Sequence, residues 1–92
     1  MARTSSHVAA PRSHCEALAW NAPGLRRWER VRVVRRTCDC ETVFYELCQA
    51  GSLRFIRRTM RTAGAPQVEE SDRWLAAEAD AMWTALLFGL VR

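Results

Sequence analysis

The stretch TVFYELCQAGSLRFIRRTM, from Thr42 to Met60, contains two alternating runs separated by a glycine-containing turn. From Val43 to Cys48 the side chains alternate between two faces, and the β-branched and aromatic residues among them favour a strand. The run from Ser52 to Arg61 alternates in the same way. Between the two runs, Gln49–Ser52 has the composition of a hairpin turn. We therefore predict two antiparallel strands here.

A third strand is predicted before this hairpin, from Glu29 to Thr37, where valines alternate with arginines as in a strand with one buried face. The residues Cys38–Glu41 join it to the hairpin, so the three strands form an antiparallel meander. An alternative stays open for the segment ETVFYELCQAG, Glu41–Gly51. This segment also fits a helix whose glycine lies just past the C-cap.

The last part of the chain follows a break at Gly64–Pro66. The residues Gln67–Glu70 fit a short fourth strand at the sheet edge. Ser71 then precedes a predicted helix of about twenty residues, with Asp72 in the first turn, where the helix dipole favours an acid. One apolar stripe of this helix is expected to cover the sheet. The stripe consists of Leu75, Ala79, Met82, Leu86 and Leu90, with Trp83 and Leu87 beside them.

The predicted helix carries a second apolar stripe nearly opposite the first. Trp74, Ala81 and Phe88 recur every seven residues, and Ala77 and Ala85 lie beside them. Exposed apolar patches mark interaction sites, so this stripe predicts an interface with a protein partner or with a second copy of the chain. Two other interpretations stay open. The N-terminal segment could fold back over the stripe, or the aromatic side chains could wrap around the edge of the core.

These elements predict an α+β fold, a three- or four-stranded antiparallel meander with one C-terminal helix packed on it. Residues 1–25 lack periodicity, so we expect a flexible N-terminal arm, and we expect residues 26–92 to form a single small domain. A chain of 92 residues buries only about 60 to 65% of the surface of its unfolded form, so the core should be small.

Positive charge is concentrated in the middle of the chain, and every basic residue is an arginine. In a meander the first and third strands are the edges, and both are rich in arginine. Guanidinium groups bind phosphates, and Trp28 or Tyr45 could stack on bases, so nucleic-acid binding is predicted as an alternative function. Arginines on edge strands also prevent aggregation of sheets, which is the simpler explanation. The candidate residues are Arg32, Arg35, Arg36, Arg54, Arg57 and Arg58.

Three of the four cysteines lie close together in the sequence, which suggests a metal or redox site. The C-x-C spacing argues against zinc, because the usual zinc knuckle is C-x2-C. The acids Asp39 and Glu41 beside the thiols disfavour a reactive thiolate. We therefore expect buried structural cysteines, no catalytic residue, no cofactor and no enzyme activity. The metal alternative takes Cys38, Cys40 and Cys48 as ligands, with Cys15 or His14 as the fourth.

The N-terminal residues lack the unbroken apolar core of a secretory signal. The longest apolar run, Ala81–Val91, is well short of the roughly 20 residues that a membrane span needs. We therefore expect a cytoplasmic protein without membrane contact, in which the thiols stay reduced.

From Trp28 onward, several strings of residues resemble a family of small uncharacterised proteins from GC-rich actinobacteria. The strings cover about two thirds of the chain and leave out the N-terminal arm. The resemblance implies no activity, cofactor or site. The strings are RVRVVRRTCDC, YELCQAG, FIRRT, VEES-x-x-W and LLFGLVR.

The function predicted first is that of a non-enzymatic accessory or regulatory protein, which binds a protein partner or its own copy through the C-terminal helix. Binding of nucleic acid by the arginine strands is the alternative. A small structural zinc domain is the third interpretation.

Overall fold

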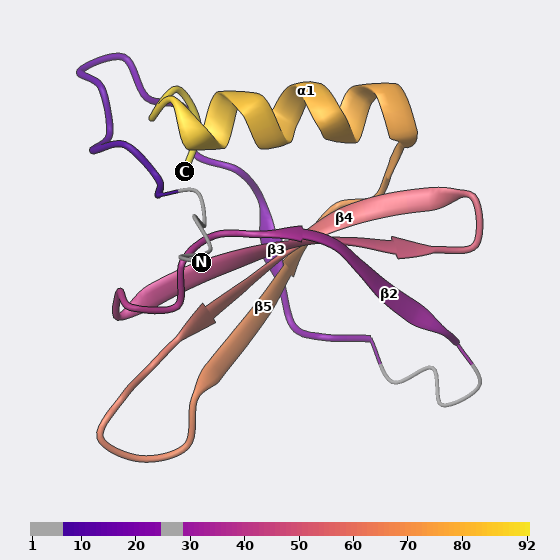
Figure 1. Ribbon diagram of the computed structural model, residues 1–92, viewed down its shortest axis with the longest axis horizontal. Helices are drawn as coiled ribbons and strands as arrows, with labels where there is room; N and C mark the ends of the chain where they lie inside the picture. The colour runs from indigo at the N-terminus through magenta and orange to yellow at the C-terminus, as the bar shows by residue number, and fades with distance from the viewer. Residues whose placement is uncertain (1–6, 25–28) are drawn as a thin grey trace, which may run out of the picture.

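An antiparallel sheet and one helix build the fold (Figure 1), and the computed structural model describes residues 7–24 and 29–92. The sheet has the order β1-β5-β4-β3-β2, and β6 pairs with β4 beside β5. The predicted α+β class is confirmed, but the predicted number of strands is too small. Trp28, predicted to stack on bases, lies outside the described residues. The elements are β1 (Trp20–Asn21), β2 (Val31–Arg36), β3 (Val43–Ala50), β4 (Leu53–Met60), β5 (Gln67–Ser71), β6 (Trp74–Leu75) and α1 (Ala76–Leu87).

The hairpin of β3 and β4 is the centre of the sheet, with a continuous register from Val43 opposite Met60 to Ala50 opposite Leu53. Its two-residue turn begins with Gly51, whose positive φ of 61° fits the first position of a type II′ turn. The alternative of a helix over Glu41–Gly51 is wrong. Val43–Ala50 form the strand β3, which buries side chains on both of its faces.

The two faces of the hairpin belong to two separate clusters of buried side chains. On one face, α1 lies across the sheet, as Figure 1 shows. On the other face, the guanidinium of Arg73 lies 4.9 Å from the centre of the Phe55 ring. The cluster under the helix contains Tyr45, Leu47, Ile56, Ala79, Trp83 and Leu86, and the opposite cluster contains Cys48, Ala50 and Phe55.

β4 is an interior strand, because both β5 and β6 pair with it. The expectation that the arginines of the third predicted strand lie at a sheet edge is therefore wrong. β2 does lie at the end of the strand order, and a shift of register between Val33 and Arg35 marks an irregularity near its middle. Such irregularities twist an edge strand and interrupt its pairing.

Ser71 belongs to β5 and does not directly precede the helix, contrary to the prediction. Its hydroxyl accepts a hydrogen bond from the backbone N–H of Ile56 at 2.8 Å and donates to the carbonyl oxygen of Asp72 at 2.9 Å. The Ser71 hydroxyl thus accepts the N–H of Ile56 at the point on β4 where the backbone pairing changes from β5 to β6. The chain then stays extended through Trp74 and Leu75, and the helix begins only at Ala76.

The helix is also shorter at its other end than predicted, with 12 residues in place of about twenty. Gly89, at φ 75°, follows the last turn in the left-handed conformation. The backbone N–H of Gly89 donates to Leu86, and that of Leu90 donates to Ala85 at 2.9 Å, which is the Schellman pattern. Leu75 and Leu90, expected on the covered face, flank the helix and are exposed.

The described part of the N-terminal arm, residues 7–24, forms backbone hydrogen bonds with the rest of the chain. β1 pairs with β5, and the N–H of Ala9 donates to Leu87 at 2.9 Å. Glu16 exchanges backbone hydrogen bonds with the segment from Leu90 to Arg92. The expectation of a flexible arm does not hold for these residues. They run beside the C-terminal segment, but Ala81 and Phe88 stay exposed, so the alternative in which the N-terminal segment covers the second stripe is not confirmed.

Candidate metal centre

The turn between β2 and β3 has a fixed base, which Thr37 provides. Its side chain is buried, with 2% of the residue exposed. The Thr37 N–H donates to the carbonyl of Tyr45, and the Thr37 hydroxyl accepts the N–H of Tyr45, both at 2.9 Å. The residues that follow Thr37 therefore leave the sheet from a defined position.

Two thiols come together in this turn. The Sγ atoms of Cys38 and Cys40 lie 2.8 Å apart, and the N–H of Cys40 points at the sulfur of Cys38 at 3.4 Å. Cys38 is half-buried, whereas Cys40 is exposed. The one-residue spacing thus brings the sulfurs together because the chain turns between them, although the same spacing argued against a site in the sequence.

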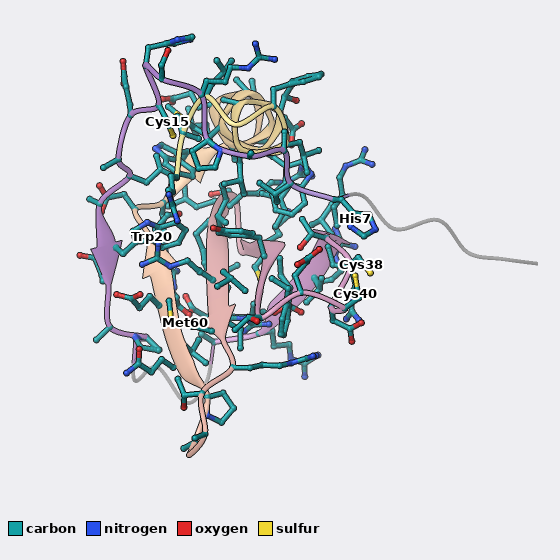
Figure 2. The ribbon with its side chains drawn as sticks, turned by 90° about the vertical axis from the view of Figure 1, so that its left-hand side faces the viewer. His7, Cys15, Trp20, Cys38, Cys40 and Met60 are labelled. Atoms are coloured by element: carbon teal, nitrogen blue, oxygen red, sulfur yellow. The ribbon has the colours of Figure 1, made fainter. Side chains whose placement is uncertain are left out.

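His7 supplies a third group from the N-terminal arm. One ligand atom each from His7, Cys38 and Cys40 lies within 4.8 Å of the other two. Figure 2 shows these three side chains gathered at one side of the molecule. The Nδ1 atom of His7 lies 4.0 Å from a carboxylate oxygen of Glu41, so an acid borders the group.

The arm reaches this position because it is fixed to the end of the helix. Besides the hydrogen bond from Ala9, the N–H of Arg12 donates to Gly89 and the Arg12 Nε donates to the carbonyl of Phe88 at 2.9 Å. A Cβ atom on Gly89 would overlap the carbonyl oxygen of Ala10, so only glycine allows this approach. His7 is thereby placed near the turn.

The surroundings of the turn raise the pKa of the Cys40 thiol. The hydrogen bond with Cys38 is the largest cause that raises the pKa of Cys40, followed by desolvation and by the charges of Cys38 and Glu41. A metal ion that binds here must displace protons from the sulfurs, which couples binding to pH.

A cavity of about 440 Å³ opens beside the group, between the arm, the β2–β3 turn and the C-terminal segment. His7 and Cys38 form part of its wall. The remaining wall is mixed, with apolar side chains from Val8, Pro11, Val43, Tyr45, Leu86 and Val91 and polar ones from Thr37, Glu41, Thr42 and Arg92.

The structure changes the predicted ligand set. Cys48 is fully buried in the cluster with Phe55, and desolvation raises the pKa of its thiol to about 11. Cys48 is thus a buried structural cysteine, as we expected, and is not part of the group formed by His7, Cys38 and Cys40. Cys15 lies on the opposite side of the molecule in Figure 2, and His14 is not among the converging groups. The sequence contains no signal for His7, because only the tertiary fold brings the arm to the turn.

The predicted nucleic-acid residues are distributed over both faces of the sheet. Those on β4 are paired with acids: Arg54 with Asp80 at 2.8 Å, Arg57 with Glu46 at 3.0 Å, and Arg58 with Glu69 at 2.6 Å. On β2, Arg36 lies 3.7 Å from Glu46, and Arg32 and Arg35 are exposed. These contacts neutralise charge that the sequence alone leaves available.

The three residues of the predicted partner stripe do not lie along one helix. Trp74 is in β6 and packs partly against the cluster under the helix. Ala81 is exposed in the middle of α1, and Phe88 follows its last turn with 55% of the residue exposed. Contact of these residues with a partner stays a prediction.

Comparisons with protein-family models, with curated proteins and with solved structures find no match to this chain. The resemblance to an actinobacterial family stays a prediction. Among the described residues, no helix is both long enough and apolar enough to cross a membrane.

Proposed function

We propose that this chain is a small zinc-binding protein whose metal is held by His7, Cys38 and Cys40. The observation that carries the proposal is that one ligand atom from each of these three residues lies within 4.8 Å of the other two. His7 is 31 or more positions away from both cysteines in the sequence. Thiolate and imidazole are the donors that zinc prefers. This proposal departs from the expectation of a chain without a cofactor.

Three protein ligands leave a fourth position on a tetrahedral ion. Water or the neighbouring carboxylate of Glu41 can take this position. The metal would join the arm to the β2–β3 turn, so it would act as a removable link between two distant parts of the chain. Such a link is useful to a small domain with a small core.

The first experiment measures zinc in protein purified in reduced form without an affinity tag. After loading and dialysis, elemental analysis should find about one zinc ion per chain. His7→Ala, Cys38→Ser and Cys40→Ser should each weaken zinc binding by about tenfold or more. The matched controls are His14→Ala and Cys15→Ser, which remove the same chemical groups elsewhere and should leave zinc content unchanged.

Cobalt provides a spectroscopic test of the ligands. Co²⁺ in the site should show a thiolate-to-metal charge-transfer band, which each Cys→Ser change at positions 38 and 40 weakens. Folded protein that takes up neither ion would contradict the proposal. Equal loss of metal from the two control variants would contradict it as well.

Self-association through the helix is a second candidate function. It is favoured by the exposure of Phe88 and of Ala77, Ala81 and Thr84 on the helix surface. Light scattering with size-exclusion chromatography should find a dimer whose dissociation constant rises about tenfold or more in Phe88→Asp. Thr62→Asp, in the exposed β4–β5 connection, is the control. A wild-type protein that stays monomeric at high concentration would exclude this candidate.

A further inference from the structure

The two thiols of the β2–β3 turn are closer together than zinc ligation requires. Two thiolates on one tetrahedral zinc ion lie about 3.8 Å apart, given Zn–S bonds of about 2.3 Å. A disulfide bond brings the sulfurs to about 2.0 Å. The observed separation of 2.8 Å between Cys38 and Cys40 lies between these two values.

We propose that Cys38 and Cys40 form a reversible disulfide within the turn, which makes the pair a site of oxidative modification. The observation that carries this inference is the distance between the two sulfurs, and it does not involve His7. One consequence, control of the metal by oxidation, rests on the proposed zinc site. The disulfide itself does not depend on it.

The surroundings of the pair allow the small movement that bond formation needs. Asp39, Cys40, Glu41 and Thr42 are all exposed, so this part of the turn is not held by packing. Thr37, in contrast, anchors the base of the turn through its contacts with Tyr45. The sulfurs can therefore approach each other while the sheet below them stays unchanged.

The other two cysteines cannot compete for this bond. Cys48 is fully buried on the face of the sheet opposite the helix, and its thiol is desolvated. Cys15 lies at the far side of the molecule, where its Sγ is 3.8 Å from the carbonyl of Glu16. An oxidant that reaches Cys40 thus finds Cys38 as the neighbouring thiol.

A disulfide across one intervening residue closes a very short loop, so it removes little entropy from the unfolded chain. Exposed or strained disulfides are also the ones that are reduced most easily. The bond should therefore form under oxidising conditions and open again with a small thiol. This behaviour is typical of regulatory disulfides rather than of structural ones.

A hydroperoxide is a sufficient oxidant. One thiolate of the pair attacks the O–O bond of hydrogen peroxide, and with uptake of a proton it gives a sulfenic acid and one water. The second thiol attacks the sulfenic sulfur, the S–S bond forms, and a second water leaves. In total two thiols lose two electrons and two protons, and the peroxide is reduced to two waters.

Oxidation would remove both thiolates from the zinc site, because a disulfide offers no thiolate to the metal. Of the three proposed protein ligands only His7 would remain, and one imidazole does not hold zinc in a closed site. The metal-bound form and the disulfide form would then be mutually exclusive states of the same turn.

The experiment treats reduced, metal-free Cys15→Ser protein with a small excess of hydrogen peroxide. The intact mass should fall by about 2 Da for the two hydrogens lost, and peptide mapping should link Cys38 to Cys40. Dithiothreitol should restore both thiols. Disulfide-linked dimers, a bond that includes Cys48, or no loss of thiols would overturn the inference.

His7→Ala separates this inference from the proposed function. The variant should form the disulfide to the same extent as the wild type, although it binds zinc weakly. In wild-type protein loaded with zinc, peroxide should release about one equivalent of the ion. Disulfide without zinc binding would disprove only the metal site, and zinc binding without a disulfide would disprove only this inference.

Discussion

The buried hydroxyl of Thr37 helps to fix the position of the turn that contains the two thiols. Thr37 is the last residue before Cys38, and its side chain and backbone both bond to Tyr45. Neither the hydrophobic pattern nor the cysteine spacing reveals this contact, because it joins two strands through one polar side chain. The geometry of the turn depends on it.

Thr37→Val keeps the shape of this side chain but leaves the N–H of Tyr45 without its acceptor. A buried donor without a partner costs about 1 to 3 kcal/mol, so the free energy of unfolding in urea should fall by that amount. Thr42→Val, in the exposed part of the same turn, should change it by less than about 0.5 kcal/mol. Equal effects of both changes would show that Thr37 has no special role.

Cys48 makes the stability depend on pH. Burial raises the pKa of its thiol from the ordinary value of 9.0 to about 11, so the unfolded chain loses this proton first as pH rises. Stability from this source is fully present below pH 9 and is lost between pH 9 and 11, by about 3 kcal/mol in total. Urea unfolding at several pH values should show this decline.

Cys48→Ala should flatten the decline relative to the wild type, whereas Cys15→Ala should keep it. The comparison isolates one thiol, because other groups that titrate in this range are common to both variants. An unchanged slope in Cys48→Ala would contradict the assignment.

At the scale of elements, the fold was predictable where local pattern and tertiary structure agree. The β3–β4 hairpin was predicted correctly, because the alternation in both strands and Gly51 point to the same structure. The helix was predicted too long, because apolar residues on both sides of its true ends continue its periodicity. Ser71 resembles a cap in sequence yet bonds within the sheet. Gly89 ends the helix in the left-handed conformation, although the apolar stripe of the predicted helix continues past it to Leu90.

The candidate site was only partly predictable for a related reason. The pair Cys38 and Cys40 is local, so it can be recognised from sequence. His7 reaches it through backbone hydrogen bonds between the arm and the end of the helix, and no periodicity encodes such contacts. Cys48 was placed in the alternative ligand set because of its nearness in sequence, but the pleat of β3 buries it within the sheet.

Gly89 connects the helix to the arm, and its replacement tests that connection. In Gly89→Ala the new Cβ would meet the carbonyl of Ala10, and the positive φ would be strained as well. Gly51→Ala is the matched control, since it has a positive φ but open space around the new Cβ. Strain alone costs about 1 kcal/mol, so Gly51→Ala should lose about that much.

Gly89→Ala should lose about 1 kcal/mol more than the control and should weaken zinc binding, because the arm carries His7. Urea unfolding and zinc titration measure the two effects. Equal losses of stability in both variants, with zinc binding intact, would show that the close approach of the arm is unimportant.

At the scale of the whole molecule, the positive charge is less available than composition suggests. Arg54 and Arg58 pair with the acids Asp80 and Glu69 of the C-terminal part, and Arg57 pairs with Glu46 of the neighbouring strand β3. Among the predicted nucleic-acid residues, the exposed arginines of β2 are then the ones available to bind a polyanion.

If single-stranded nucleic acid binds, Arg32 and Arg35 on β2 should carry the contact. The Arg32→Ala/Arg35→Ala variant should lower the slope of log affinity against log salt by about 1 to 2, as expected for two phosphate contacts. Arg57→Ala should instead reduce stability by about 1 to 3 kcal/mol, since it leaves the largely buried carboxylate of Glu46 without its closest partner. Fluorescence anisotropy at several salt concentrations measures the slope, and no binding at low salt would exclude this function.

The pairing of the arm with the C-terminal segment also sets an order of events during folding. Residues 9–18 bond to residues 87–92, which is among the largest separations in sequence that this chain offers. Contacts of this kind form late, because the entropy of closing a long loop must be overcome first. The β2–β3 turn is local, so Cys38 and Cys40 should meet early. The nascent chain would thus have its two thiols in place before the imidazole of His7 arrives.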